Sequence, residues 1–262
     1  MQCRSWSARL SRFLRARFSE VCSRGLKWAD EPRVMAAWRH GWDADHYVRL
    51  LRWRDEGFYP RVVYDVGAHA GSWSGMCQAV FSPTECVLFE PQREYLEQAR
   101  ARHCRQGGNW RLVQLALGDS EQSHPLHLTQ NRAAASILTP LTAGDLTAQT
   151  RVIAQETVRL MPLDAVVEKE KLPAPDLIKI DVQGFESKVL TGGAATLRKT
   201  QRIVIETSLR PIYEGQSLLP DILRTLTSEG FHLDDMSEVC RTWPAGRLWQ
   251  ADLWLRRVEP PT

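Results

Sequence analysis

Four short apolar runs in this chain each end in a carboxylate, and these carboxylates are the first candidates for chemistry. They are Asp65, Glu90, Asp181 and Glu206. If the runs are parallel strands of one sheet, their carboxyl ends meet at the edge where open α/β sheets bind ligands. One such residue is unremarkable, because carboxylates commonly cap helices. Four at one edge indicate a ligand that carries a positive charge and several hydroxyl groups.

The segment 62–71, VVYDVGAHAG, is typical of a buried strand, a glycine-rich turn and a helix that begins near Ser72. The backbone N–H groups of such a turn and the dipole of the next helix attract an anion. His69, two residues after Gly67, would crowd a pyrophosphate, whereas a single amino-acid carboxylate needs less room. Asp65 repels phosphates and suits an ammonium or a sulfonium. The turn therefore favours S-adenosylmethionine. The alternatives are NAD in an oxidoreductase, or a polar turn that only satisfies its own hydrogen bonds.

Two further strand ends carry residues that suit an adenosine. Glu90 follows the apolar run 87–89 and can accept both ribose hydroxyls, in an NAD site as well as in an adenosylmethionine site. After the third run, Asp119 can accept the adenine amino group while Leu117 covers the face of the ring. The simpler alternatives are a helix cap for Glu90 and an ordinary Gly-Asp turn for Asp119.

After residue 60 the apolar runs alternate with helical patterns, which predicts an α/β fold with βαβ units and a mostly parallel sheet. The predicted strands are Arg61–Val66, Glu85–Phe89, Arg111–Ala116, Asp176–Ile180, Arg202–Ile205, Phe231–Asp234 and Ala251–Leu255. The predicted helices are Ser72–Phe81, Arg93–Cys104, Phe185–Leu190 with Ala194–Lys199, and Leu218–Glu229. Pro125–Thr129 is a candidate for a short extra strand, and Gln130–Glu156 fits no element.

The first sixty residues differ from the rest. Residues 1–40 hold nine Lys and Arg against three Asp and Glu, a surplus of six where the whole chain has three. Apolar residues over 10–22 recur at helical spacing with arginines between them. This pattern suits an amphipathic helix packed on its own domain, or one that lies on an anionic membrane surface. With a second helix over 43–56, we expect residues 1–60 to form a basic helical extension and residues 61–262 the α/β domain.

The composition narrows the class of protein. The chain has 262 residues, 43% of them apolar, and a net charge of only +3, which gives no support to nucleic acid as a partner. No apolar run approaches the roughly 18 residues of a membrane span. The six cysteines form no C-x-x-C pair and no zinc-like cluster. Free thiols in a reducing cytoplasm are therefore expected.

Several motifs, in this order, resemble the FkbM-type S-adenosylmethionine-dependent methyltransferases: VYDVGAHAG, LFEP, ALGD, LIKIDVQGFE, IVIE and QADLWL. The resemblance runs from about Val62 to Leu255, and many enzymes of that family are O-methyltransferases of natural products and saccharides. It implies a Rossmann-like class I methyltransferase sheet of seven strands, the last of them antiparallel. The family's usual I-D-V-E-G is I-D-V-Q-G here, so a role that needs a carboxylate at Gln183 is lost.

The resemblance also implies roles for single residues, carried over position by position. The methionine end of the cofactor would be held by Asp65, Gly67, Ala68, His69 and Gly71, the ribose by Glu90 and the adenine by Asp119, with Asp181 between cofactor and acceptor.

Methyl transfer to a hydroxyl group also needs the hydroxyl proton to be removed, and a general base contributes about 10²–10⁴-fold. Asp181 is the first candidate, with Glu206, Glu186 and His69 behind it. An equal alternative is that Asp181 only orients cofactor or water. It could also hold a divalent cation that acidifies the hydroxyl, although no spacing here calls for a metal.

The acceptor is the least determined part of this hypothesis. The chain has ten tryptophans, and aromatic faces stack on sugar rings, although Trp at helical spacing more often packs in a core. Candidate linings of an acceptor pocket are Ser136 with its Ala-rich neighbours and the segment 243–249. The remaining alternative is a non-catalytic peripheral membrane protein that uses residues 1–30.

Overall fold

The computed structural model describes residues 32–82, 85–142, 150–241 and 248–258. The chain divides into two compact units, Met1–Glu56 and Gly57–Thr262. In the described parts of the chain, no helix is both long and apolar enough to cross a membrane.

In the first unit, the described residues form helices α2 (Pro32–His40) and α3 (Ala44–Asp55). Asp43 caps α3, because its side chain accepts a hydrogen bond from the backbone N–H of His46 at 2.8 Å. The predicted second helix is therefore confirmed. The predicted basic helix over 10–22 lies outside the described residues.

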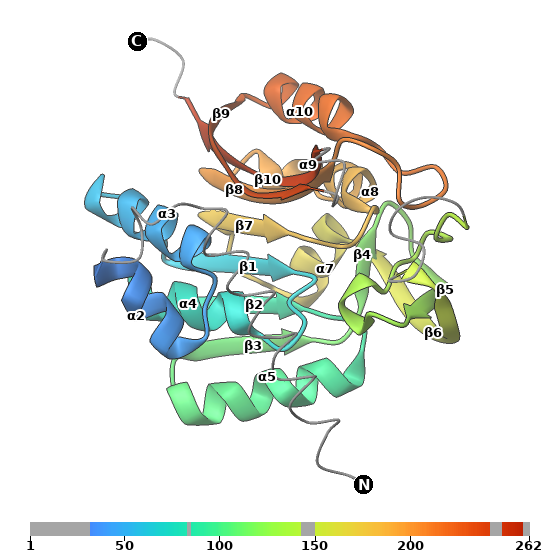
Figure 1. Ribbon diagram of the computed structural model, residues 1–262, viewed down its shortest axis with the longest axis horizontal. Coiled ribbons are helices and arrows are strands. Elements are labelled where there is room, and N and C mark those ends of the chain that lie inside the picture. Colours follow the sequence, from blue (N-terminus) through green and yellow to red (C-terminus); the bar gives the residue numbers. More distant parts are fainter. Residues whose placement is uncertain (1–31, 83–84, 143–149, 242–247, 259–262) are drawn as a thin grey trace, which may run out of the picture. The chain divides into compact units, whose positions relative to one another are not determined.

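The second unit is built on a seven-stranded sheet in the order β3-β2-β1-β7-β8-β10-β9 (Figure 1). Its strands are β1 (Val62–Val66), β2 (Glu85–Phe89), β3 (Asn109–Val113), β7 (Leu177–Ile180), β8 (Arg202–Ser208), β9 (Phe231–Arg241) and β10 (Leu248–Arg257). Neighbouring strands pair in parallel, except that β10 runs antiparallel to both β8 and β9. The predicted sheet, with its last strand antiparallel, is confirmed.

Helices pack on this sheet and bury its apolar strands. They are α4 (Ser72–Phe81), α5 (Arg93–Gln106), α7 (Leu163–Glu170), α8 (Glu186–Gly192), α9 (Ala194–Leu197) and α10 (Leu219–Ser228). Residues 62–66 of β1 are buried at every position, as expected for a parallel strand covered on both faces. One core cluster joins Tyr64 and Ile205 of the sheet to Val189 of α8 and Leu226 of α10.

A second, three-stranded sheet in the order β4-β6-β5 is not among the sequence predictions. Its strands are β4 (Ala116–Gly118), β5 (Gln122–Thr129) and β6 (Val152–Pro162). The predicted third strand, 111–116, is confirmed as β3 but its end is wrong, because the chain leaves the large sheet after Val113 and joins the small one at Ala116. The extra strand at 125–129 is confirmed as part of β5. The sequence does not predict β6, because residues 152–157 are exposed and show no alternation of apolar and polar residues.

β8 is longer than predicted, and this changes the position of one candidate. The strand continues to Ser208 rather than ending at Ile205. Glu206 therefore lies within the strand, opposite Asp252 of β10 in the antiparallel register, instead of at a strand tip.

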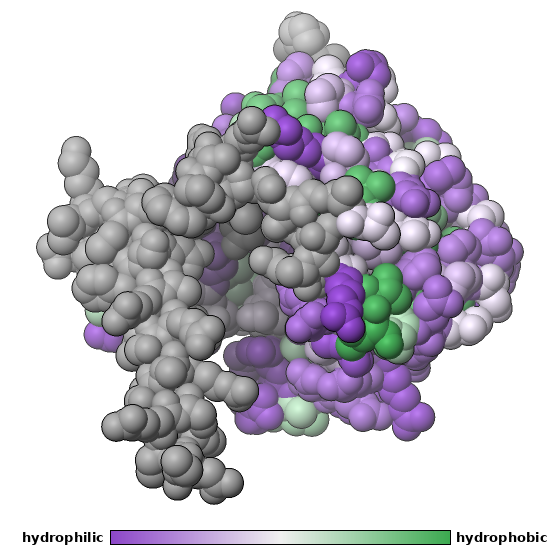
Figure 2. All heavy atoms as spheres, turned by 45° about the vertical axis from the view of Figure 1, so that its right-hand side comes forward, coloured by the Kyte–Doolittle hydropathy of each residue, from purple (hydrophilic) through white to green (hydrophobic). Residues whose placement is uncertain are grey.

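Hydrophilic residues predominate among the described residues on the face drawn in Figure 2, and hydrophobic ones form small groups. In the described part of the second unit, large hydrophobic side chains are exposed at Tyr59, Val152, Ile153, Leu233 and Val258. Scattered exposed side chains of this kind are ordinary.

Candidate active site

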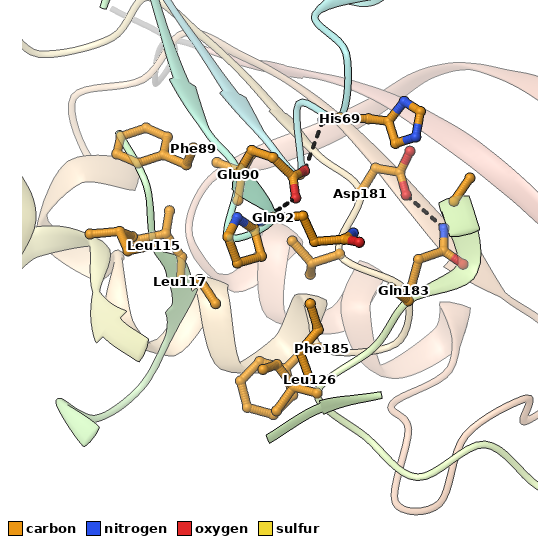
Figure 3. A pocket seen from close by; sticks show the side chains of 18 of the residues that line it. His69, Phe89, Glu90, Gln92, Leu115, Leu117, Leu126, Asp181, Gln183 and Phe185 are labelled. Atoms are coloured by element: carbon orange, nitrogen blue, oxygen red, sulfur yellow. Dashed lines mark hydrogen bonds between the residues drawn. The ribbon is translucent and has the colours of Figure 1, made fainter. Parts of the chain in front are cut away.

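A cavity of about 270 Å³ lies at the carboxyl ends of β1, β2 and β7 (Figure 3). The strand order reverses between β1 and β7, and such a switch point leaves a crevice at this edge of an open sheet. Glu90, Asp181 and Gln183 give the cavity polar groups, while Leu117 and Phe185 are among its apolar lining. This volume is slightly below the range of about 300–1,000 Å³ that is typical of small-molecule sites.

The turn after β1 brings the backbone very close to β7. Gly67 has a φ of 76°, and a Cβ there would lie 1.9 Å from the carbonyl oxygen of Asp181. The backbone N–H groups of Gly67 and Ala68 both donate to the carbonyl of Phe89, at 2.9 and 3.1 Å. Only glycine fits this position, because any side chain meets both a strained φ and a backbone atom.

The other predicted turn residues divide into two groups. Gly67 and His69 line the cavity, whereas Ala68 and Gly71 are not among its lining residues. Gly71 begins α4 with a φ of 70°, and a Cβ there would lie 2.9 Å from the ring of Trp110. Gly71 therefore permits close packing behind the turn.

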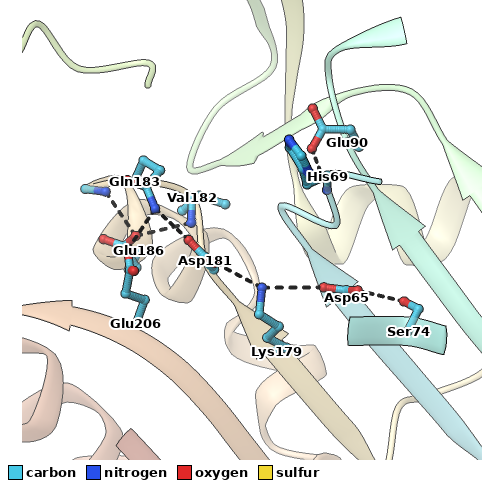
Figure 4. Close-up of polar contacts among 11 residues, drawn as sticks. Asp65, His69, Ser74, Glu90, Lys179, Asp181, Val182, Gln183, Glu186 and Glu206 are labelled. Carbon is cyan, nitrogen blue, oxygen red and sulfur yellow. Dashed lines mark hydrogen bonds and ion pairs between the residues drawn. The ribbon is translucent and has the colours of Figure 1, made fainter. Parts of the chain in front are cut away.

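Asp65 lies beneath the cavity and is fully buried. Its Oδ2 accepts a hydrogen bond from the hydroxyl of Ser74 at 2.6 Å, and its Oδ1 is 3.8 Å from the ammonium of Lys179 (Figure 4). Burial raises the pKa of Asp65 above its ordinary value, and the charge of Lys179 opposes that shift. Asp65 joins β1 to α4 and β7, and it does not line the cavity.

Glu90 lines the cavity at the end of β2 and is held by two backbone N–H groups. Gln92 donates to its Oε1 and His69 to its Oε2, each at 2.9 Å. Only 4% of Glu90 is exposed, and burial raises its pKa to about 7 despite these two donors. Each carboxylate oxygen keeps a lone pair for a further donor, such as a ribose hydroxyl.

His69 reaches back over the start of α5. Its ring centroid lies 3.6 Å from that of Tyr95, with the planes tilted by 37°. Burial lowers the pKa of His69, while the carboxylate of Asp181 opposes that shift. The imidazole is therefore the neutral form at physiological pH.

The structure separates the two residues predicted for the adenine. Leu117 lines the cavity, but Asp119 is not among the lining residues. Its Oδ2 instead accepts from the ammonium of Lys188 at 2.7 Å. An adenine contact by Asp119 would need this ion pair to open.

Asp181 lines the cavity at the end of β7, and two donors fix its carboxylate (Figure 4). Lys179 donates to its Oδ2 at 3.1 Å and Gln183 to its Oδ1 at 2.8 Å. Burial lowers the pKa of Lys179, but the carboxylates of Asp181 and Asp65 outweigh that effect and hold it above the ordinary value. The ammonium therefore stays charged and favours an ionised Asp181.

The two other predicted proton acceptors lie behind Asp181. Neither Glu206 nor Glu186 lines the cavity. Glu186 caps the turn after β7, because its Oε1 accepts from the backbone N–H groups of Val182 and Gly184 at 3.2 and 3.0 Å; burial raises its pKa to about 7. Burial, followed by nearby carboxylates, also raises the pKa of Glu206 well above its ordinary value. Of the three carboxylates predicted as proton acceptors, Asp181 is therefore the one that lines the cavity.

Some of the residues predicted to line an acceptor pocket do line the cavity, and others do not. Ala133, Ala135 and Ile137 line the cavity, but Ser136 is buried and its hydroxyl donates to the carbonyl of Gln183 at 2.6 Å. Ser136 therefore anchors this segment. Of the segment 243–249, residues 243–247 lie outside the described ranges.

Sequence reasoning misses Lys179, Arg132 and Tyr213. Lys179 has a signal, because it is the charged residue inside an apolar strand and lies two positions from Asp181, on the same face. Arg132, from the short 3-10 helix η2 (Arg132–Ala134), lines the cavity. Arg132 and Tyr213 have no signal, because only the tertiary structure brings their segments to the strand ends.

Within the described ranges, no group of three or more His, Cys, Asp or Glu side chains is placed to hold a metal ion. Cys77, Cys86 and Cys104 are free thiols.

Residues 65–233 match the family model of the methyltransferase FkbM domain. Two curated relatives are similar over part of their length. The 2-O-methyltransferase NoeI of Sinorhizobium fredii is 30% identical over 178 residues, which are 64% of this chain and 71% of the relative. The hexuronic acid methyltransferase AglP of Haloferax volcanii is 24% identical over 160 residues, which are 61% of this chain and 60% of the relative.

Solved structures give weaker likenesses. The magnesium protoporphyrin IX methyltransferase ChlM of Synechocystis has a TM-score of 0.47 and 13% identity, covering 88% of each chain. The precorrin-6y C5,15-methyltransferase of Geobacter metallireducens has a TM-score of 0.46 and 14% identity, covering 81% of this chain and 86% of the other. The strand order of the sheet defines the fold without them.

Proposed function

This chain belongs to the FkbM methyltransferase family, and from that premise we propose that it transfers the methyl group of S-adenosylmethionine to a hydroxyl oxygen of a saccharide or natural-product acceptor. The observation that carries the proposal is that Glu90 and Asp181, from two different strands, line one cavity beside the Gly67 turn. The relatives support the acceptor class, since one is named a 2-O-methyltransferase and the other a hexuronic acid methyltransferase.

The described residues fit the cofactor. Glu90 suits the ribose hydroxyls, because its carboxylate is fixed by two backbone donors and still has lone pairs free. The apolar residues Phe89, Leu115 and Leu117 suit an adenine ring. The proposed cofactor-binding set is Asp65, Gly67, Ala68, His69, Gly71, Glu90, Leu117, Asp119 and Asp181. In it, Asp65, Ala68 and Gly71 act by shaping the turn, and Asp119 acts from outside the cavity lining.

Adenosylmethionine, when bound, supplies a methyl group on a positively charged sulfur. The residues of this chain hold the acceptor's oxygen in line with that methyl and remove its proton. Asp181 is the proposed proton acceptor, ahead of Glu206 and Glu186, because it is the one of the three that reaches the cavity. Its two donors leave lone pairs for a hydroxyl group, and ordered positioning contributes much of the rate.

The test is calorimetric titration with S-adenosylhomocysteine. The full chain is expected to bind it in the micromolar range, and Glu90→Ala and Gly67→Val are expected to abolish binding. Glu97→Ala is the matched control, because Glu97 is exposed on α5, away from the cavity, and forms a surface ion pair with Arg93. Absence of binding by the wild-type chain at millimolar nucleotide would overturn the proposal.

We also propose that residues 61–262 form the catalytic domain and residues 1–60 an extension to it. The free state of the described thiols supports a cytoplasmic location. The small net charge of +3 supports a small-molecule acceptor rather than a nucleic acid.

A further inference from the structure

Gln183 connects two carboxylates that come from neighbouring strands. Its Nε2 donates to Asp181 Oδ1 at 2.8 Å and to Glu206 Oε2 at 2.9 Å (Figure 4). An amide nitrogen has two hydrogens, so it satisfies both acceptors at once. We propose that Gln183 is a positioning residue, which orients Asp181 for proton transfer and joins it to Glu206 without adding a negative charge.

The ionised carboxylate of Asp181 fixes the orientation of the amide. A flipped amide would place its oxygen against the oxygen of Asp181, with no hydrogen between them. The amide Oε1 lies 3.2 Å from the hydroxyl of Tyr213, whose single hydrogen is shared between this oxygen and the carbonyl of Ala134 at 3.1 Å. Burial raises the pKa of Tyr213, so its hydroxyl keeps its proton. Asp181 therefore determines which end of the amide faces the carboxylates, and Tyr213 supports that orientation.

The backbone of Gln183 is fixed as well. Its φ is 55°, in the left-handed region that few non-glycine residues adopt. Its carbonyl accepts from the hydroxyl of Ser136 at 2.6 Å. Both the backbone and the side-chain amide of Gln183 are thus fixed by hydrogen bonds, which a residue that only filled space would not need.

A neutral side chain matters because acids are crowded around Asp181. Positive charge comes from Lys179 on β7, which donates to it at 3.1 Å. The other titratable groups that act on this site are Asp65 on β1, His69 in the turn after β1, Glu90 after β2, Glu186 on α8, Glu206 on β8, Asp252 on β10 and Tyr213 after β8. A glutamate at position 183 would add a like charge beside Asp181, and like charges raise the pKa of a carboxyl.

This inference rests on the proposed function, and its test needs no acceptor. Adenosylmethionine carries a permanent positive charge on sulfur, whereas adenosylhomocysteine has a neutral thioether. The ratio of their two affinities, measured by calorimetry between pH 3.5 and 8, therefore reports the charge on the carboxylate beside the sulfur. In the wild type the preference for the cation is expected to grow with pH as that carboxylate loses its proton.

Two variants test the role of the amide. In Gln183→Glu the midpoint of this preference is expected to move to higher pH by about one unit, because a like charge is added. In Gln183→Met it is expected to move in the same direction by less, because a donor to the ionised form is lost. Gln122→Glu is the matched control, since Gln122 is exposed on β5, donates to the hydroxyl of Ser120 and does not line the cavity. Its midpoint is expected to equal that of the wild type.

The outcomes separate the two proposals. A wild-type chain that binds neither nucleotide would contradict the methyltransferase function itself. Normal adenosylhomocysteine binding with an unmoved midpoint in either folded variant would overturn the role of Gln183 alone. Loss of adenosylhomocysteine binding in both variants, with normal thermal unfolding, would also overturn it, because Gln183 would then be a cofactor ligand.

Discussion

Glu90 and Glu186 show how position gives one residue type two functions. Burial raises the pKa of each to about 7, and each accepts hydrogen bonds from two backbone N–H groups. Glu90 lines the cavity, while Glu186 does not and closes the turn that carries Gln183. The difference is that Glu90 follows β2 and faces the cavity, whereas Glu186 begins α8 behind the turn after β7.

Because the pKa of Glu90 is near 7, cofactor binding should depend on pH. Ribose hydroxyls donate best to the ionised carboxylate, so adenosylhomocysteine affinity is expected to fall as pH drops below about 7, by up to roughly tenfold per unit. In Glu90→Gln this dependence is expected to vanish and the affinity at pH 8 to be lower. Titration calorimetry from pH 5.5 to 8 measures both, and a variant that keeps the wild-type slope would contradict the assignment.

The folding stability of the ligand-free protein depends on pH in the opposite direction from cofactor binding. A carboxyl whose pKa is raised in the folded state stabilises the ligand-free protein below its unfolded value of 4.5. That contribution is lost as pH rises through about 7. As the pH rises through about 7, ionisation of Glu90 is therefore expected to strengthen cofactor binding and to lower the stability of the ligand-free protein.

Asp181 is predicted to act on the rate more than on cofactor binding. Asp181→Asn removes the proton acceptor but keeps the shape of the side chain, so kcat for the methylation of an alcohol acceptor is expected to fall about 10²–10⁴-fold. Adenosylhomocysteine affinity is expected to change little, since this ligand lacks the positive sulfur. Radiolabelled methyl transfer to a panel of sugars measures the rate. Unchanged kcat with an otherwise saturated enzyme would show that Asp181 only orients its neighbours.

At the scale of elements, the small sheet completes the cavity. Leu126 of β5 and the segment 132–137 supply part of its lining. This segment is fastened by Ser136 to Gln183 and by Arg132 to Glu94 at 3.1 Å. The Arg132 pair is largely exposed and contributes little to stability, whereas the Ser136 bond is partly buried. The segment 132–137 is therefore held mainly by its bond to the turn after β7.

The contact between β4 and α8 is tight enough to test. A Cβ on Gly192 would lie 1.9 Å from the carbonyl oxygen of Gly118, and backbone cannot move aside as a flexible side chain can. Gly192→Ala is expected to lower the free energy of unfolding by about 2–3 kcal/mol. Thr191→Ala, at the adjacent exposed position, is expected to change it by less than about 0.5 kcal/mol. Equal urea midpoints for the two variants would refute the close contact.

At the scale of the molecule, the described chain holds two units of different character. Residues 1–40 carry a local surplus of positive charge, whereas the largely apolar cavity of the second unit contains two carboxylates, Glu90 and Asp181, beside Arg132. The match to the family model lies within the second unit. The positively charged sulfur of the cofactor is complementary to these two carboxylates, which is the basis of the proposed chemistry.

Local pattern alone determined the parallel sheet, its helices and the residues at the ends of β1, β2 and β7, because apolar periodicity and glycine-rich turns are properties of adjacent residues. It also indicated Asp65, Glu90 and Asp181 together, since parallel strands end at one edge. Tertiary structure alone decided which carboxylates reach the cavity, that Glu206 lies inside a strand, and that Gln183 joins Asp181 to Glu206. Those facts depend on contacts between residues far apart in the chain, such as Ser136 with Gln183, and no spacing along the chain encodes them.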